Sequence, residues 1–311
     1  MDAAIYGLIV ADVIAQPIDL RGKLPERGGL SLLNSLTLTT GGNVCNVSIA
    51  MTRLGMTAAA AGLVGKDTFG SSVIGLLRAA GVETSCISAD PRAQTSATVV
   101  AVDPSGERSF FHAPGVNALL DPKSFRRCFE TFRQCTWLHI GYFGLLPNDF
   151  VRALPELLAD FRAESPGTRI ALDTAHPPAE RALLDPILPH LDVFAPSRPE
   201  ANALTGESDP RRIVSSFRQR MQKGLIGIKL DDEGCYLDDG NGAMHIEACR
   251  ITPLDTTGAG DVWYAGLLTA LRRNMTLEQC GKFANRAAAD CCLALGASAG
   301  VRSFAETLAR M

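Results

Sequence analysis

The residues with the clearest potential for chemistry lie in a glycine-rich run in the last quarter of the chain. Residues 255–261 have the sequence DTTGAGD, and an apolar run over 262–268 follows them directly. This order is typical of a loop that leads into the N-terminus of a helix, where backbone N–H groups and the helix dipole can face one anion. The backbone amides of Gly258, Ala259 and Gly260 are therefore candidates to stabilise a phosphoryl group during its transfer.

Asp261, the last residue of this run, would lie in the first turn of the predicted helix, beside the anion. A carboxylate repels a phosphate, so the chemistry open to Asp261 there is to accept the proton of an attacking hydroxyl group. The same spacing also fits an ordinary glycine-rich turn in which Asp261 is the N-cap. Other phosphate motifs fit less well: Asp67 stands where a P-loop needs Ser or Thr after Lys66, and the run 258–260 lacks the third glycine of a dinucleotide fingerprint.

A second glycine pair, Gly41-Gly42, precedes a predicted helix over 43–54. Glycines at this point would let the backbone approach a ligand closely. Asn46 would lie one turn into the helix, where its amide can donate to and accept from vicinal hydroxyl groups. An asparagine that only satisfies hydrogen bonds on the helix face would produce the same pattern.

Asp12 follows a short apolar run over 4–10, which predicts a buried first strand. Ligands of α/β sheets bind beyond the carboxyl ends of the strands, so Asp12 is a candidate to accept hydrogen bonds from sugar hydroxyl groups. The alternative is an aspartate that only shapes a turn.

These runs resemble the two signatures of the PfkB (ribokinase-like) carbohydrate kinases. Residues 255–261 are similar to the C-terminal signature of that family, and residues 41–46 are similar to its N-terminal signature, in the same order. The resemblance implies ATP-dependent phosphorylation of a primary hydroxyl group of a small sugar or sugar-like substrate, with Mg²⁺ as cofactor. It makes Asp261 the base and the run 258–260 the anion hole, and it places the sugar on Asp12, Gly41, Gly42 and Asn46.

The resemblance also implies a nucleotide and metal site in the second half of the chain. Glu200 matches a family glutamate that organises Mg²⁺ through water, although an acid at a helix start is favourable in any case. The implied nucleotide-binding residues are Ser197, Lys229, Asp231, Gly234 and Asn285. Ser197 and Asp231 depart from the asparagine and glycine that are usual in the family. Asp255 and Thr257 are in the position where the family can hold a monovalent cation such as K⁺.

Apolar segments of strand length alternate with helical patterns along most of the chain. We predict further strands over 57–64, 137–140, 169–173, 192–195 and 225–230, and helices over 69–80, 149–163 and 277–293. This βαβ rhythm indicates an α/β fold with a mostly parallel sheet and helices on both faces.

Two segments, 13–40 and 94–116, have strand-and-turn texture instead. We therefore expect one domain over 1–311, a ribokinase-like three-layer α/β/α sandwich, with these two segments as an inserted small β-sheet. The resemblance implies that such a sheet is a lid over the sugar and a contact surface in a homodimer. Arg108 and His112 lie in this texture and are candidates to touch the substrate.

The composition argues against several other classes of protein. Of the 311 residues 46% are hydrophobic and 20% are charged, which favours a large buried core over disorder. The net charge is −3 without a long basic block, so we expect no nucleic-acid partner. The N-terminus lacks a signal-peptide pattern and no apolar run is long enough to cross a membrane. With 9 scattered cysteines, which suit free thiols, we expect a soluble cytoplasmic protein.

The substrate is open at this level. Ribokinases proper carry asparagine, lysine and glutamate where this chain has Val10, Asn43 and the run 141–143, so ribose is not indicated. Tyr142 and Phe143 add aromatic surface that could stack on a base, which makes a nucleoside kinase of the same family an alternative. The replacements at Ser197 and Asp231 leave a third reading open, a non-catalytic protein that binds a sugar or nucleotide.

Overall fold

The central feature of the fold is a nine-stranded sheet, seen in a computed structural model that describes residues 1–19, 28–176 and 181–311. Positions 20–27 of the expected inserted segment lie outside the described residues. The strands of the sheet are β1 (Ala3–Tyr6), β4 (Ala58–Gly65), β5 (Glu83–Asp90), β8 (Trp137–Ile140), β9 (Arg169–Leu172), β10 (Val193–Phe194), β11 (Leu225–Lys229), β12 (Cys235–Asp238) and β13 (Ala243–Ile246).

The strand order is β13-β12-β11-β10-β9-β8-β1-β4-β5. Every neighbouring pair from β5 to β11 is parallel, and only β12 runs against its two neighbours. The predicted, mostly parallel sheet is thus confirmed. Parallel strands end at one edge of the sheet, so the residues that follow them come together there.

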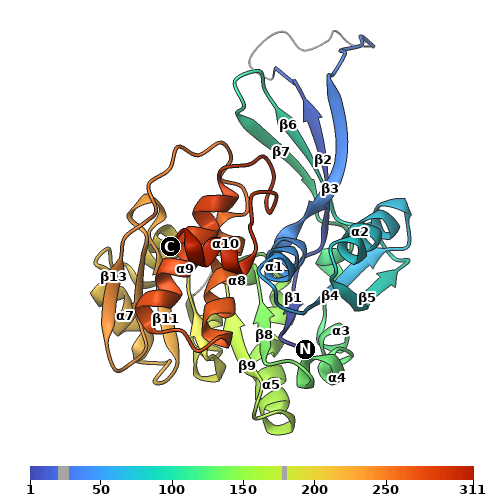
Figure 1. Cartoon of the computed structure of the whole chain (residues 1–311). Helices are drawn as coiled ribbons and strands as arrows, with labels where there is room; N and C mark the ends of the chain where they lie inside the picture. The colour runs from blue at the N-terminus through green and yellow to red at the C-terminus, as the bar shows by residue number, and fades with distance from the viewer. Residues whose placement is uncertain (20–27, 177–180) are drawn as a thin grey trace.

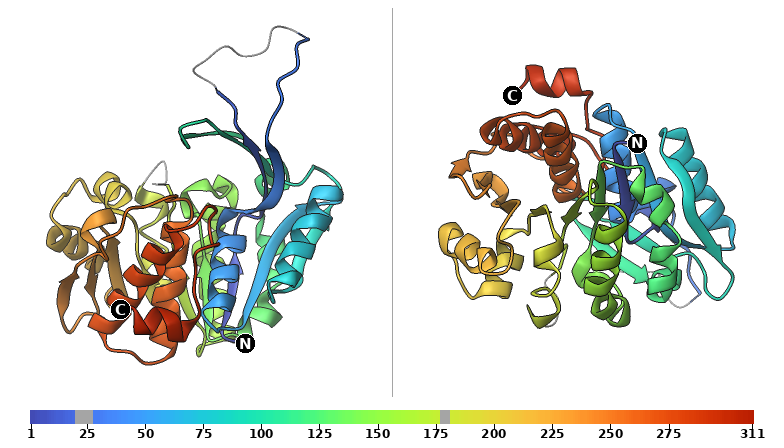
Figure 2. Two further views of the ribbon diagram at one scale, coloured as in Figure 1. Left: turned by 45° about the horizontal axis from the view of Figure 1, so that its top comes forward. Right: turned by 90° about the horizontal axis from the view of Figure 1, so that it is seen from below.

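Helices cover both faces of the sheet, which makes the three layers visible in Figures 1 and 2. Side chains alternate along a strand, so Ile5 of β1 packs into one core and Tyr6 into the other. The first core lies under α1 (Gly42–Arg53), α2 (Thr68–Ala79), α8 (Ala259–Arg272) and α9 (Leu277–Cys291), with α10 (Phe304–Ala309) against α9. The second lies under α3 (Pro122–Arg126), α4 (Phe129–Arg133), α5 (Asn148–Glu164), α6 (Arg198–Thr205) and α7 (Pro210–Arg218).

Short 3₁₀ turns connect several of these elements. They are η1 (Gly115–Leu119), η2 (Phe143–Leu145), η3 (Arg181–Leu183), η4 (Leu188–His190) and η5 (Asp231–Glu233). In the ranges that the structure describes, no helix combines the length and the apolar character needed to span a membrane.

A second sheet of four strands rises beyond the body of the molecule (Figure 1). We call it the small sheet. Its strands are β2 (Val10–Gln16), β3 (Ser35–Gly41), β6 (Ala97–Val102) and β7 (Arg108–Ala113), in the order β3-β2-β6-β7. Paired residues of neighbouring strands share a face, so Asp12, Thr98 and His112 lie on one face, and Val99 and Phe111 on the other.

The predicted single strand over 4–10 is wrong, because the chain turns at Gly7 and divides into β1 and β2. Gly7 has φ +149°, and a Cβ there would lie 2.6 Å from Asn43 Oδ1. Asn43 also accepts a hydrogen bond from Leu8 N at 2.9 Å and so holds the turn. Asp12 consequently lies inside β2 of the small sheet and not in a loop beyond the first strand.

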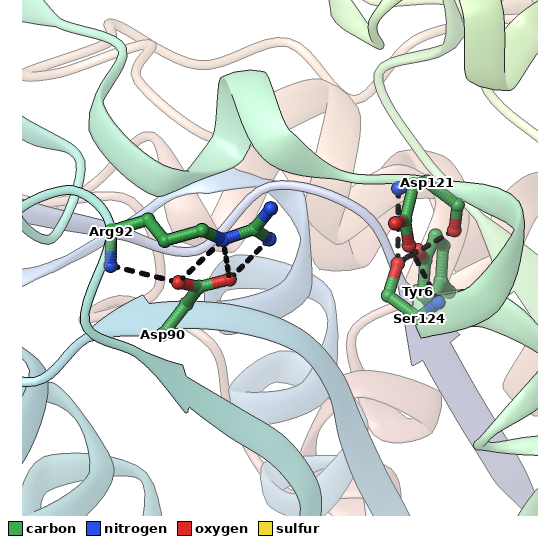
Figure 3. Close-up of polar contacts among 5 residues, drawn as sticks. All are labelled: Tyr6, Asp90, Arg92, Asp121 and Ser124. Atoms are coloured by element: carbon green, nitrogen blue, oxygen red, sulfur yellow. Dashed lines mark hydrogen bonds and ion pairs between the residues drawn. The ribbon is translucent and has the colours of Figure 1, made fainter.

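Polar contacts around β1 and after β5 are satisfied within the protein (Figure 3). The buried Tyr6 hydroxyl lies 3.0 Å from Ser124 Oγ, and Ser124 N donates to Asp121 Oδ1 at 2.7 Å in the cap of α3. Arg92 Nη2 forms an ion pair with Asp90 Oδ2 at 2.6 Å. These bonds fix the ends of elements, because a buried hydroxyl or helix N–H without a partner is costly.

Candidate active site

The glycine-rich run forms the loop and helix start that its sequence predicts. Helix α8 has Gly258 as its N-cap, with φ +74°. A Cβ at Gly258 would lie 2.4 Å from the carbonyl oxygen of Ala297, so only glycine fits. A Cβ at Gly260 would lie 3.7 Å from Lys229 Nζ, so a cationic group lies beside the N-terminus of the helix. Helix dipole and ammonium group both favour an anion at this point.

Asp261 is buried in the first turn of α8, with 3% of its surface exposed. Its Oδ2 accepts hydrogen bonds from Asn46 Nδ2 and Tyr142 Oη, both at 2.8 Å. Oδ1 is also buried, and it has no hydrogen-bond partner among the described residues. Burial disfavours the charged carboxylate and raises the pKa of Asp261 to about 6, although the bonds from Asn46 and Tyr142 act in the opposite direction. A carboxylate with such a pKa and a vacant oxygen is suited to accept a proton near neutral pH.

Tyr142 is a site residue that the sequence analysis assigned differently. It follows β8, has φ +55°, and uses its hydroxyl group on Asp261. Phe143 is 1% exposed and packs in the second core, so it offers no surface for stacking on a base. Of the aromatic surface expected at 142–143, only the partly exposed ring of Tyr142 is present. A polar aromatic residue directly after a buried strand was the signal that could have pointed to Tyr142.

Asp12 and the glycine pair lie close together, as predicted, at the base of the small sheet. A Cβ at Gly41 would lie 2.1 Å from Asp12 Oδ2, and one at Gly42 would lie 2.4 Å from Leu8 O. Burial raises the pKa of Asp12, with a hydrogen bond to Thr98 opposing the shift. Asp12 and Asp261 both act on the buried thiol of Cys45, whose pKa is raised to about 12, first by burial and then by these two carboxylates. The candidate sugar ligand and the candidate base therefore both lie near Cys45, in the first turn of α1.

A buried charged pair lies where β9 and β11 end. Lys229 Nζ forms an ion pair with Asp173 Oδ1 at 2.7 Å. Burial favours the neutral amine, but the carboxylates of Asp173 and Glu200 outweigh it and raise the pKa of Lys229. Lys229 therefore stays cationic beside the loop of α8. The sequence analysis placed Lys229 at the nucleotide but did not foresee Asp173 as its partner.

Glu200 lies at the start of α6 and is largely buried. Its Oε2 accepts hydrogen bonds from Thr174 Oγ1 at 2.6 Å and Ser197 N at 2.7 Å. Ser197 is the N-cap residue of α6, so Glu200 closes the start of its own helix through the backbone of Ser197. No hydrogen bond in the described ranges uses Glu200 Oε1.

These residues fit Mg²⁺ held through water and phosphate. The part of the chain that the structure describes has no group of three or more His, Cys, Asp or Glu side chains that could enclose a metal. Mg²⁺ does not need one, because it keeps several waters and binds one or two carboxylates together with phosphate oxygens. Glu200, with one oxygen outside the cap of α6, is suited to this kind of binding.

The other predicted nucleotide-binding residues follow β11 or lie on α9. Asp231 is exposed and has φ +55°, which is the conformation that explains why glycine is common there. Gly234 has φ +96°, and a Cβ there would lie 2.1 Å from Ile246 O. The Asn285 amide is used within the protein, because Oδ1 accepts from Trp263 Nε1 and Nδ2 donates to Ile246 O and Glu247 O.

Asp255 and Thr257, the candidate cation ligands, contact a side chain from the small sheet. Arg108 Nη1 donates to Asp255 Oδ1 and, at 2.6 Å, to Thr257 Oγ1. Asp255 Oδ1 also accepts from Thr257 N at 2.9 Å, and Oδ2 accepts from Gly296 N at 2.6 Å. Burial opposes the charged form, yet the bonds from Arg108 and the backbone lower the pKa of Asp255 to about 2. Neither the sequence pattern nor the resemblance predicted this contact.

Comparison with known proteins identifies the family and the fold. The family model for pfkB family carbohydrate kinases matches residues 2–303. Fructokinase-1 of Oryza sativa subsp. japonica is 29% identical over 308 residues, which cover 93% of this chain and 94% of that protein.

Solved structures share the fold at low sequence identity. A structure of Arabidopsis thaliana ribokinase complexed with ribose and ATP matches with a TM-score of 0.82 at 20% identity, and covers 99% of this chain and 97% of that one. An E. coli protein provisionally named Ribokinase II, solved in complex with ATP and Mg²⁺, matches with a TM-score of 0.83 at 23% identity, and covers 98% and 97%. The predicted ribokinase-like fold is thus confirmed.

Proposed function

The chain belongs to the pfkB family of carbohydrate kinases, and we propose on this premise that it transfers the γ-phosphoryl group of ATP to a primary hydroxyl group of a small sugar. The observation that carries the proposal is the state of Asp261. Its carboxylate is buried, has a pKa of about 6 and keeps Oδ1 without a partner in the described structure. It lies one residue from Gly260, at the N-terminus of α8, where backbone amides can hold the phosphoryl group.

In the proposed reaction the sugar hydroxyl oxygen attacks the γ-phosphorus as the bond to the bridging oxygen of ADP breaks. Asp261 Oδ1 accepts the hydroxyl proton, while Asn46 and Tyr142 hold Oδ2. The amides of Gly258, Ala259 and Gly260 stabilise the charge on the transferred group. When bound, Mg²⁺ neutralises charge on the phosphate oxygens, and Glu200 would hold it through water.

The proposed sugar site lies between α1 and the small sheet. Asp12, Asn46 and the backbone at Gly41 and Gly42 would bind the sugar, and Lys229, Asp231 and Gly234 would line the nucleotide side. We propose that the small sheet is a lid inserted in a single kinase domain. A closed lid excludes water that would otherwise hydrolyse ATP.

Two alternatives to this proposal are a nucleoside kinase and a non-catalytic protein, and the acceptor assay below separates them from it. A nucleoside substrate was suggested by aromatic surface at 142–143; Phe143 is buried, so only the partly exposed ring of Tyr142 could stack on a base. A non-catalytic protein was suggested by Ser197 and Asp231. Against it, the proposal relies on the loop 258–260 and the Asp261 carboxylate, which are present whatever stands at positions 197 and 231.

A homodimer through the small sheet is a further part of the proposal. Three apolar side chains, Leu36, Val99 and Phe111, are exposed on the face opposite to Asp12. Exposed apolar side chains that share one face of a sheet are suited to association with a second copy. Sedimentation velocity of the wild type and of Phe111→Glu tests this, with Phe69→Glu on α2 as a control for an exposed phenylalanine outside the small sheet.

The experiment for the main proposal is an ADP-release assay with Mg-ATP. The acceptors are fructose, ribose, 2-keto-3-deoxygluconate, tagatose 6-phosphate, adenosine, inosine and cytidine. Turnover on one sugar that falls by about 10²–10⁴-fold in Asp261→Asn supports the proposal. Turnover restricted to nucleosides would transfer the assignment to a nucleoside kinase. ATP binding without turnover on any acceptor in the panel, or kcat near that of the wild type in Asp261→Asn, would contradict the role given to Asp261.

A further inference from the structure

Arg108 connects the small sheet to the loop that leads into the anion site. It is the first residue of β7, and the pairing of β2, β6 and β7 places it on the same face as Asp12. Its guanidinium reaches Asp255 and Thr257, which are 147 and 149 residues further along the chain. The Asp255 side chain is fully buried and the Arg108 side chain is 18% exposed, so this ion pair is shielded from water.

The contact leaves no room for a monovalent cation at the same oxygens. The side-chain oxygens that these two residues could offer to an ion such as K⁺ include Asp255 Oδ1 and Thr257 Oγ1, and both accept hydrogen bonds from Arg108 Nη1. Asp255 Oδ2 is used by Gly296 N. The residues therefore do not fit the ion together with Arg108. A guanidinium brings the same single positive charge, and it adds donors in a fixed planar geometry.

We infer that Arg108 takes the place of a monovalent cation at Asp255 and Thr257 and acts as a positioning residue for the anion loop. The inference rests on the proposed kinase function. It predicts that the protein needs no K⁺, and that order in the loop 255–258 depends on the position of the small sheet.

The loop has the contacts needed to transmit this effect. Thr257 directly precedes Gly258, the N-cap of α8, and Gly258 packs against Ala297 so closely that a Cβ would lie 2.4 Å from its carbonyl oxygen. Asp255 in turn holds Gly296 N. A shift of Asp255 or Thr257 therefore displaces the amides at 258–260, and displacement of catalytic donors by about 1 Å costs on the order of 10²-fold in rate.

The test compares the wild type, Arg108→Lys and Arg108→Ala in KCl and in tetramethylammonium chloride at equal ionic strength. Two quantities are measured: the melting temperature of the ligand-free protein, and kcat on the acceptor found above. We expect wild-type values that are the same in both salts. In tetramethylammonium chloride, Arg108→Ala should have a lower melting temperature than the wild type, and its kcat should be about 10- to 100-fold lower than that of the wild type. In KCl, both the melting temperature and kcat of Arg108→Ala should be partly restored, because K⁺ can then bind the oxygens of Asp255 and Thr257 that Arg108 no longer occupies.

A matched control is Arg218→Ala, which removes the ion pair of an arginine with the same exposed fraction, 18%, to Asp238 on the outer strand pair β11–β12. The melting temperature of Arg218→Ala should be lower than that of the wild type by the same amount in both salts, and its kcat should be unchanged.

A higher melting temperature of the wild type in KCl than in tetramethylammonium chloride would overturn the inference. A loss of kcat or melting temperature in Arg108→Ala that KCl does not relieve would also overturn it. The melting temperatures need no substrate, so they test Arg108 even if the kinase assignment fails. Arg108→Lys, which keeps the charge, should fall between the other two proteins, and it serves if Arg108→Ala does not fold.

Discussion

Replacing Asp261 by asparagine should make the protein more stable at neutral pH while it removes activity. The carboxylate is buried, and the pKa of Asp261 is raised from 3.8 to about 6 mainly by that burial. Asparagine has nearly the same shape and is neutral at every pH. It can still accept the bonds from Asn46 and Tyr142 through its carbonyl oxygen.

The magnitude follows from the pKa difference between the folded and unfolded chain. Between pH 3.8 and about 6 the folded protein keeps the Asp261 proton that the unfolded chain releases, so the free energy of unfolding falls as the pH rises. A shift of about 2 units corresponds to about 3 kcal/mol in total, of which roughly 2 kcal/mol lies between pH 4.5 and pH 8. In Asp261→Asn this fall in the free energy of unfolding does not occur, because the amide does not titrate. Its advantage over the wild type should therefore grow by roughly 2 kcal/mol across that interval.

Urea unfolding of the ligand-free proteins at pH 4.5, 6 and 8 measures this difference directly. The change of this difference with pH cancels the contributions of other titrating groups. The new amide adds only a constant, because it does not titrate. Asp232→Asn, at an exposed position beside β11, is the matched control and should show no growing advantage. A constant difference between Asp261→Asn and the wild type over this pH range would refute the reasoning, because Asp261 would then have an ordinary pKa.

Three further predictions concern the neighbours of Asp261 and the small sheet. Tyr142→Phe removes a hydrogen bond that lowers the pKa of Asp261, so the acidic limb of the kcat profile should move to higher pH; an unmoved limb would exclude Tyr142 from the site. Lys229→Met leaves Asp173 buried without its cation and should cost about 3–5 kcal/mol in urea unfolding, whereas a loss below 1 kcal/mol would show that the pair is open to solvent. Phe111→Glu should lower the sedimentation coefficient at micromolar concentration, and a wild type that is already monomeric would contradict the proposed dimer.

The order of residues along the chain was enough to predict features that depend on local chemistry. The alternation of strand and helix patterns predicted the parallel sheet and its two helical layers, because periodicity is a property of neighbouring residues. Gly258 and the apolar run after it predicted the loop and the start of α8, because a left-handed N-cap needs glycine. The division of the first strand at Gly7 was missed, since the apolar pattern continues through it and the turn depends on a contact with Asn43.

Only the tertiary structure decided which side chains meet. The partners of Asp261 lie 215 and 119 residues away at Asn46 and Tyr142, and Arg108 reaches Asp255 across 147 residues. No local pattern encodes such pairs, because they exist only after parallel strands end at one edge and the small sheet is placed beside that edge. DTTGAGD was enough to predict an anion-binding loop with an acid beside it, whereas the raised pKa of Asp261 and the guanidinium at the expected cation site depend on burial and distance, which arise only from packing.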